Sequence, residues 1–251
     1  MKTQRILSIV KMELTRQVRD PLVLIFTTLF VPALIVVFGL SLGNSYGWGP
    51  EYSIFEIMLP GWIAYAGLLT IYDVAAGVSA ERESGLETRL YSTPLTSGEY
   101  IFSQMLSYSI KPAIQLILGL GAAIAVGFRP LNGIIGYLLV FVFMLIFTFS
   151  SVGFGMITAT FSKTASAAGG LAFIFIVPQQ IFGTFIPPAF LGAASLEWII
   201  PSWYPTRVMG MVFAGVSLTY WEIWVRFGIL LAFSLAVYGI GILLYERKKR
   251  R

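Results

Sequence analysis

The side chains best suited to chemistry in this chain gather in one polar segment, residues 80–99, between two long apolar stretches. The charged residues of its first half are Glu81, Arg82, Glu83, Glu87 and Arg89. A single charge at the centre of a membrane helix costs about 3 kcal/mol on insertion scales, so such a cluster does not belong in hydrocarbon. We therefore expect the segment to lie in water or at a protein interface, where it could bind a soluble partner.

A short helix is expected inside this segment. Gly85 and the Thr93-Pro94 pair punctuate the chain, and Leu86 and Leu90 between them are four residues apart, on one face of a helix. An amphipathic helix on a tight loop is what a membrane protein would present to a soluble partner. The alternative, an ordinary solvated hairpin between two spans, fits the same spacing.

Several kinds of reactive site are missing from the sequence. It has no cysteine and no histidine, which excludes disulfides and thiolate metal sites and removes the commonest general base. It has no phosphate-binding Gly-x-x-x-x-Gly-Lys motif, so the chain does not supply an ATP site of its own. We expect no catalytic residue, no metal and no cofactor bound by this chain.

Polar side chains within the apolar stretches are candidates for a transport path. Asp73 could belong to a proton path, because ionisable groups inside membrane helices are functional candidates by default. The plainer interpretation, which we favour, places it near the surface and paired with a basic neighbour. Gln179 and Gln180 are better candidates, because the adjacent Pro178 frees backbone carbonyls and amides in hydrocarbon need partners. These two amides could also bridge helices without any role in transport.

The composition indicates an integral membrane protein. Of the 251 residues, 57% are hydrophobic and 12% are charged, and the mean hydropathy is +0.82. Soluble domains carry about 25% charged residues. At about 20 residues per span, the chain has room for six transmembrane helices. We expect them at residues 21–42, 55–80, 101–126, 134–160, 165–185 and 221–245, within a single all-α domain covering residues 1–251.

Two further segments do not have the pattern of a straight span. Residues 1–20 are basic and place Ile6, Val10 and Leu14 in one row, which predicts a helix lying in the membrane interface. A signal peptide is the less favoured alternative, because the next apolar run is too long and lacks a cleavage site. Residues 187–206 are interrupted by prolines, which predicts a broken, re-entrant external segment, with a plain external loop as the alternative.

Basic residues are distributed unequally between the two sides of the expected spans. One side holds 13 of the 17 lysines and arginines, in the two terminal segments, the 80–99 loop and the turn at Lys163. The other side holds Arg129, Arg207 and Arg226. The positive-inside rule therefore predicts cytoplasmic termini and a cytoplasmic loop in a multi-pass protein of the plasma membrane. The same rule explains the net charge of +5 without any nucleic-acid partner.

The 80–99 loop also carries a family resemblance. Glu81-Arg82-Glu83-x-Gly85, followed by Leu90 and Thr93-Pro94, resembles the loop of type-2 ABC exporter permeases. The six-span order, the interfacial first helix and the broken segment before the last span resemble the same family, so the likeness extends over nearly the whole chain. One departure follows Gly85, where the family commonly has Thr-Leu-Glu and this chain has Leu-Glu-Thr, with the acid one position early.

The resemblance implies a function and a set of partners. The loop would hold a coupling helix that contacts an ATPase through Glu81, Arg82, Glu83, Gly85, Leu86, Glu87, Arg89 and Leu90. Two separate ATPase subunits would bring ATP and Mg, and a second permease copy or a close homologue would complete the path between spans two and five. The complex would export a drug-like, lipid or polysaccharide substrate by alternating access.

A secondary transporter and a membrane-embedded enzyme are the alternatives to export driven by ATP. An ion-gradient-driven secondary transporter needs buried acids in mid-membrane, and Asp73 is the only serious candidate for one. A membrane-embedded enzyme has almost no chemistry available without histidine, cysteine or clustered acids in the spans.

Overall fold

The computed structural model describes residues 2–43, 53–86, 89, 96–129, 131–185 and 199–249, and these ranges contain helices and no strand. The elements are α1 (Lys2–Val18), α2 (Pro21–Leu42), α3 (Ile54–Glu83), α5 (Ser97–Ala125), α6 (Gly133–Phe161), α7 (Ala165–Gln179), the π-helix η1 (Gln180–Phe185), α8 (Trp203–Phe213) and α9 (Trp221–Lys249). Within these ranges, six segments are long and apolar enough to cross a membrane: α2, α3, α5, α6, α7 with η1, and α9. The prediction of an all-α protein with six such helices is confirmed.

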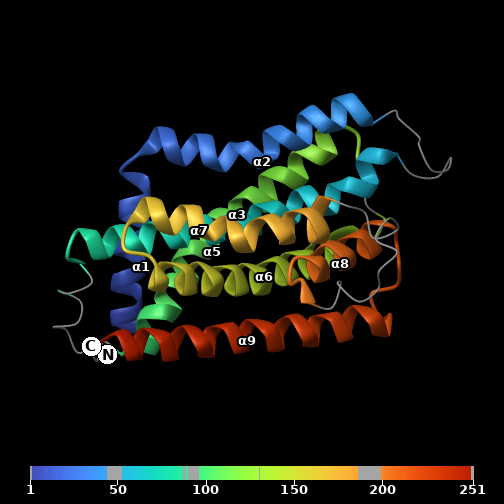
Figure 1. Cartoon of the computed structure of the whole chain (residues 1–251). Coiled ribbons are helices and arrows are strands. Elements are labelled where there is room, and N and C mark those ends of the chain that lie inside the picture. Colours follow the sequence, from blue (N-terminus) through green and yellow to red (C-terminus); the bar gives the residue numbers. More distant parts are fainter. Residues whose placement is uncertain are drawn as a thin grey trace.

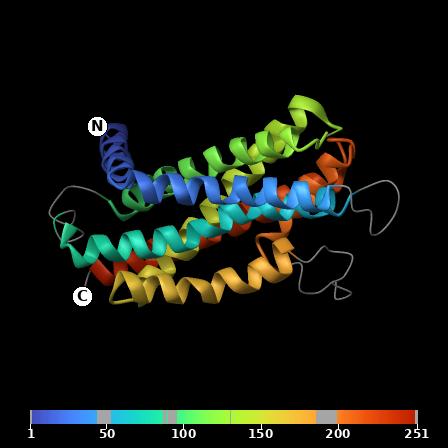
Figure 2. The same cartoon turned by 90° about the horizontal axis from the view of Figure 1, so that it is seen from above.

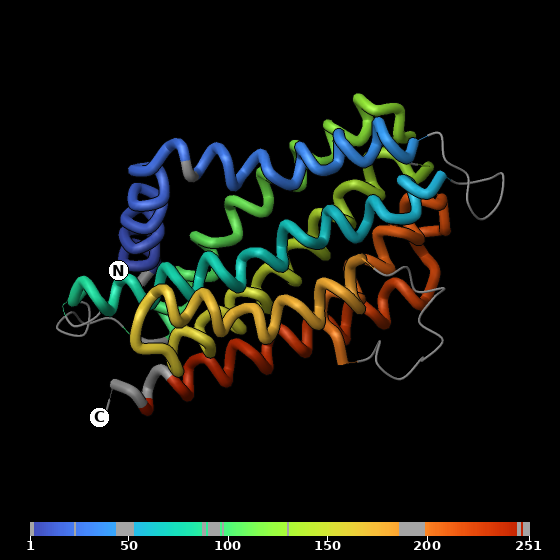
Figure 3. The backbone as a smooth tube through the Cα atoms, turned by 45° about the horizontal axis from the view of Figure 1, so that its top comes forward, coloured from blue at the N-terminus to red at the C-terminus, as the bar shows by residue number. Residues whose placement is uncertain are grey.

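The six long helices run side by side, and both termini lie at one end of the bundle (Figure 1). Helix α1 crosses that end and packs against α5 and α2 (Figures 2 and 3). Helix α3 is the central element, because it packs against α2, α5, α6, α7, η1 and α8. The burial of the helices supports this central position. In α3, 67% of the most apolar 18-residue stretch is buried within the chain, against 22% in α2 and in α9.

Local sequence signals explain where two of the central helices begin. Ser53 caps the first turn of α3 and forms a reciprocal capping box with Glu56. Thr96 and Glu99 form the same capping box at the start of α5. Each box satisfies two backbone N–H groups that a helix start would otherwise leave without partners.

Small residues let the helices around α3 approach closely, as is common between membrane helices. A Cβ at Gly67 would lie 2.8 Å from Phe147 of α6, and one at Gly155 would lie 2.6 Å from Val74 of α3. At Gly61 an added Cβ would overlap the backbone carbonyl of Thr184 in η1. The glycines therefore set the spacing between α3 and its neighbours.

The chain departs from regular α-helix after Pro178. The α-helical pattern of α7 changes to the π-helix η1 at Gln180. Of the expected re-entrant segment, residues 187–198 lie outside the described ranges. Its remainder, residues 199–206, leads into the short helix α8, which packs against α3, α6, η1 and α9. Pro201, Trp203 and Pro205 in this part are buried within the chain.

A glycine substitution tests the central position of α3. We expect Gly61→Ala to destabilise the protein by about 1 to 3 kcal/mol, because the new methyl group meets backbone atoms that cannot rotate away. Gly170→Ala is the matched control, since a Cβ on this exposed glycine of α7 meets no atom within 4 Å. Thermal unfolding in mild detergent should show a lower midpoint for Gly61→Ala alone. Equal midpoints for the two variants would contradict the close contact of α3 with η1.

Candidate functional site

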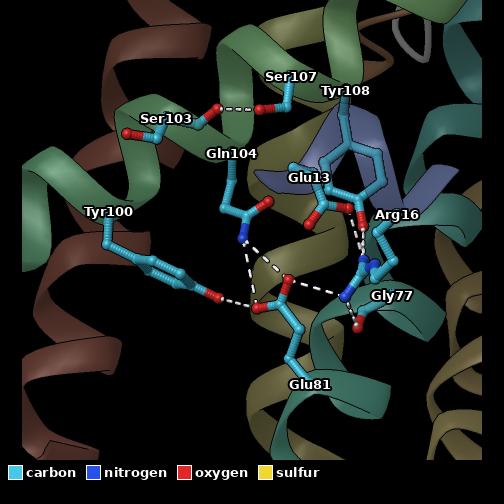
Figure 4. Close-up of polar contacts among 9 residues, drawn as sticks. All are labelled: Glu13, Arg16, Gly77, Glu81, Tyr100, Ser103, Gln104, Ser107 and Tyr108. Carbon is cyan, nitrogen blue, oxygen red and sulfur yellow. Dashed lines mark hydrogen bonds and ion pairs between the residues drawn. The ribbon is translucent and has the colours of Figure 1, made fainter. Parts of the chain in front are cut away.

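A buried polar cluster lies where α1, α3 and α5 meet, at the end of the bundle that holds the termini (Figure 4). We define the polar cluster as Glu13 and Arg16 of α1, Glu81 of α3, and Tyr100, Gln104 and Tyr108 of α5. It connects three helices at the last turn of α3, which is the beginning of the 80–99 segment.

Glu81 is the centre of the polar cluster. Its side chain is fully buried, and its carboxylate accepts hydrogen bonds from the Arg16 guanidinium at 2.8 Å and the Tyr100 hydroxyl at 2.7 Å. The Gln104 amide adds two longer bonds of 3.4 Å. A buried carboxylate needs such partners to offset the loss of hydration. Our expectation that Glu81 lies in water or at an interface with a partner is therefore wrong, because α3 continues to Glu83 and turns this residue into the chain's own interior.

Arg16 joins the two acidic members of the cluster. Its guanidinium contacts Glu13 at 2.5 Å and Glu81 at 2.8 Å, and it also donates to the Tyr108 hydroxyl at 2.8 Å. Burial disfavours the charged guanidinium, but the neighbouring Tyr108, Glu13 and Glu81 outweigh that effect and hold the pKa of Arg16 above its ordinary value. One cation therefore bridges α1 to α3 with charge-assisted hydrogen bonds, the stronger kind.

The next two charged residues bind a different part of the bundle. Arg82 donates to the carbonyl oxygens of Ala159 at 2.8 Å and Ser162 at 3.1 Å, at the end of α6. Glu83 accepts from the backbone N–H of Ala165 at 2.9 Å, at the start of α7. A cation at a helix C-terminus and an anion at an N-terminus both complement the helix dipoles. These two side chains attach the end of α3 to the α6–α7 turn.

The short helix expected after Gly85 is only partly within the described residues. Gly85 adopts φ +71°, a left-handed conformation that favours glycine just beyond the end of α3. The N–H of Arg89 then donates to the Gly85 carbonyl at 3.3 Å, a helical spacing, and Arg89 is exposed while Leu86 is half-buried. Glu87 and Leu90 lie outside the described residues. Contact of this segment with an ATPase stays a prediction.

Asp73 has a basic partner. Its carboxylate lies 2.7 Å from the Lys111 ammonium of α5, and both side chains are partly buried. The interpretation of Asp73 as a member of an ion pair is confirmed. A role for this residue in transport stays a prediction.

The two glutamines do not act alike in the structure. Gln179 is 5% exposed, and its amide donates to the Phe175 carbonyl at 3.1 Å, one turn back along α7. Its backbone carbonyl accepts from the Ser202 hydroxyl at 2.9 Å, which links α7 to the residues before α8. Gln180 is half-buried and begins η1. The Gln179 link to the residues before α8 is thus made by its backbone and not by its amide, and a place for either glutamine in a transport path stays a prediction.

Sequence reasoning missed four members of the polar cluster: Glu13, Tyr100, Gln104 and Tyr108. Glu13 did carry a signal, because it is three and four residues from Val10 and Ile9, the buried residues of α1. An acid on the apolar face of an amphipathic helix needs a buried partner. The α5 residues carried no comparable signal, since tyrosine and glutamine are ordinary in a helix that faces other helices. Across the described ranges, no group of three or more metal-ligating side chains comes together.

Removing one hydroxyl tests the polar cluster. We expect Tyr100→Phe to lower the free energy of unfolding by about 2 kcal/mol, because the buried Glu81 carboxylate loses a short hydrogen bond. Tyr72→Phe is the matched control, since Tyr72 of α3 is 43% exposed and makes no hydrogen bond with a described residue. The check is the unfolding midpoint of each variant in the same detergent. A Tyr100→Phe midpoint equal to that of the control would show that Glu81 does not depend on this bond.

Comparison with known families gives one clear match. A family model described as "ABC-2 type transporter" matches residues 4–213, which include every member of the polar cluster and extend to the end of α8. No curated protein is similar enough in sequence to be reported as a relative. The matched range holds most of the chain and five of the six apolar helices. The chain therefore belongs to the ABC-2 type transporter family and is the multi-pass membrane permease subunit of an ABC transporter.

Proposed function

We propose that this permease is the membrane half of an ATP-driven exporter whose ATPase docks on the segment that follows α3. The observation that carries the proposal is the double attachment of the last turn of α3. Glu81 ties it to α1 and α5, and Arg82 and Glu83 tie it to the α6–α7 turn. The chain beyond this turn presents Leu86 and the exposed Arg89. A force applied there would act on the bundle through α3.

Helix α3 has the length and the packing to transmit such a force. It is 30 residues long, so a regular helix of this length spans about 45 Å, the thickness of a bilayer with its headgroups. It packs along α7 and reaches η1 at the other end. ATP-driven closure of the ATPases would thus shift α3 against α7 and switch a path between them from inward to outward access. Spans two and five, the candidates for this path, are α3 and α7 with η1.

We also propose the partners and the orientation of the complex. Two ATPase chains would carry ATP and Mg, and a second copy of this permease or a close homologue would pack beside it. Helix α7 supports this arrangement, because several of its apolar side chains are only partly covered within the chain, including Phe173, Ile174 and Val177. The excess of basic residues at the end with the termini supports a cytoplasmic location of that end, in the plasma membrane. The same exposed apolar surface would suit an amphipathic drug, a lipid or a lipid-linked polysaccharide.

A transporter driven by an ion gradient is the less supported alternative. Such a protein needs an acid that can gain and lose a proton or cation within the transport path. Asp73 is held 2.7 Å from Lys111, so its charge already has a partner inside the chain. The ion pair favours a structural role for Asp73.

Charge reversal tests the docking segment. We expect the double variant Leu86→Asp, Arg89→Glu to reduce copurification of the ATPase with a tagged permease by about tenfold, because an apolar contact and a cation are lost together. Thr219→Glu is the control, since this exposed residue lies between α8 and α9, at the opposite end of the bundle. The retained ATPase is quantified by mass spectrometry of the purified complex. A double variant that retains as much ATPase as the control would place docking elsewhere.

A second experiment separates ATP drive from ion drive. We expect Asp73→Asn to lower the unfolding midpoint, because Lys111 loses its partner, and Asp73→Asn with Lys111→Gln to recover part of the loss. ATP hydrolysis by the reconstituted complex should stay within about twofold of the unaltered complex, since the pair lies outside the ATP site. It should also be the same with and without a proton gradient. Hydrolysis that depends on the gradient, and loses that dependence in Asp73→Asn, would favour the ion-driven alternative.

A further inference from the structure

A cavity of about 370 Å³ lies at the end of the bundle opposite the termini. It is bounded by the first turns of α3, the turn between α5 and α6, and α8. Its interior is mainly apolar, with Pro60, Phe128 and Phe213 among the lining residues. The two phenylalanine rings are 5.1 Å apart in an edge-to-face arrangement. The volume is within the range of about 300 to 1,000 Å³ that is usual for small-ligand pockets.

The charged groups of the cavity are two arginines and one glutamate. Arg129 and Arg207 are exposed, and neither makes a hydrogen bond or ion pair with any described residue. In contrast, Arg16, Arg82 and Arg226 each bind an acid or a carbonyl of the chain. Glu56 accepts a hydrogen bond of 2.9 Å from the Ser53 N–H, so part of its carboxylate is already used. Glu222 of α9 interacts electrostatically with Arg207, but its direct ion pair is with Arg226. The cavity therefore presents two guanidinium groups that have no direct hydrogen bond or ion pair within the described residues and can bind an anion.

The cavity lies at the level where the apolar helices end. Helix α3 begins at Ile54, α5 ends at Ala125 and α6 begins at Gly133. The lining residues before α8 lie in or next to these helix ends, and the others lie on or directly after α8. In a bilayer this is the boundary between hydrocarbon and headgroups. An apolar interior next to free cations at that boundary matches a molecule with an acyl chain and an anionic head.

The two elements that carry the arginines are linked by hydrogen bonds within the chain. The Asn132 side chain donates to the carbonyls of Val212 at 3.0 Å and Val216 at 2.7 Å. These bonds hold the α5–α6 turn, which carries Arg129, against the end of α8, the helix that carries Arg207. Because the two elements are fastened together, no movement of the backbone is needed for both arginines to reach one ligand, and the entropy lost on binding is that of the two side chains.

We propose that this cavity binds a membrane lipid with an anionic headgroup. The phosphate or carboxylate of the head lies between Arg129 and Arg207, where guanidinium groups can donate paired hydrogen bonds to it. The first part of the acyl chain lies against Pro60, Phe128 and Phe213. A lipid in this position bridges α3 to α8 and braces the end of the bundle remote from the ATPase. Binding depends neither on ATP nor on the docking segment, so it can be tested on the purified permease alone.

The test measures binding of 1-palmitoyl-lysophosphatidylglycerol to the purified permease in a neutral detergent, by native mass spectrometry over a range of lipid concentrations. We expect Arg129→Gln with Arg207→Gln to weaken binding at least about tenfold, since two charge-assisted contacts are lost. Lys163→Gln, an exposed basic residue in the α6–α7 turn, should leave binding unchanged. Equal binding by the double variant and by Lys163→Gln would overturn the proposal.

Two further arms separate the contributions of the head and the chain. Inorganic phosphate should compete only weakly, because it lacks the acyl chain, whereas competition as strong as that of the lysolipid would reduce the site to a simple anion site and overturn the proposal. Gly210→Leu fills the cavity from α8 and should weaken lysolipid binding without changing the charges. If this variant fails to fold, Gly210→Ala replaces it. The alanine Cβ would lie 3.9 Å from Pro60, an ordinary van der Waals distance, so this smaller change should not disturb the fold. Unchanged binding in a folded, cavity-filled Gly210→Leu would overturn the placement of the chain.

Discussion

The arrangement of the bundle end that holds the termini depends on the burial of the Glu81 carboxylate. A charge removed from water must be surrounded by donors, and Glu81 has Arg16, Tyr100 and Gln104 around it. These donors come from two other helices, so the charge can be satisfied only when α1, α3 and α5 are assembled. The polar cluster therefore specifies how the crossing helix α1 and the helix α5 meet the end of α3, whatever its net contribution to stability.

Helix α3 connects this end of the permease with the opposite one. Near the docking end its last turn is bonded to α1, α5 and the α6–α7 turn, and at its other end Gly61 allows direct backbone contact with η1. The cavity that presents Arg129 and Arg207 is bounded by the first turns of the same helix. The proposed docking segment, the proposed path and the proposed lipid site are thus all connected to the single helix α3. A movement of α3 caused by the proposed ATPase would therefore reach the opposite side of the membrane.

Much of the fold could be predicted because it follows from local patterns. A membrane helix is an apolar run of sufficient length, and the predicted spans agree with α2, α3, α5, α6, α7 with η1, and α9 to within a few residues. The helix starts at Ser53 and Thr96 are visible as serine or threonine followed three residues later by glutamate. The change of helix type after Pro178 also follows from the missing backbone donor of proline. The pairing of Asp73 with a basic neighbour was expected from the cost of an isolated charge.

The sequence by itself determined the six apolar helices, their order, the polar segment between the second and third, and the absence of an ATP motif. Only the tertiary structure decided where each charge of that segment lies. From the sequence we expected Glu81, Arg82 and Glu83 together in water or at a protein interface, but the structure buries the first and binds the other two to the α6–α7 turn. The physical reason is distance along the chain. Arg16 and Glu81 are 65 residues apart, and local periodicity holds no information about a partner that only folding brings within 2.8 Å.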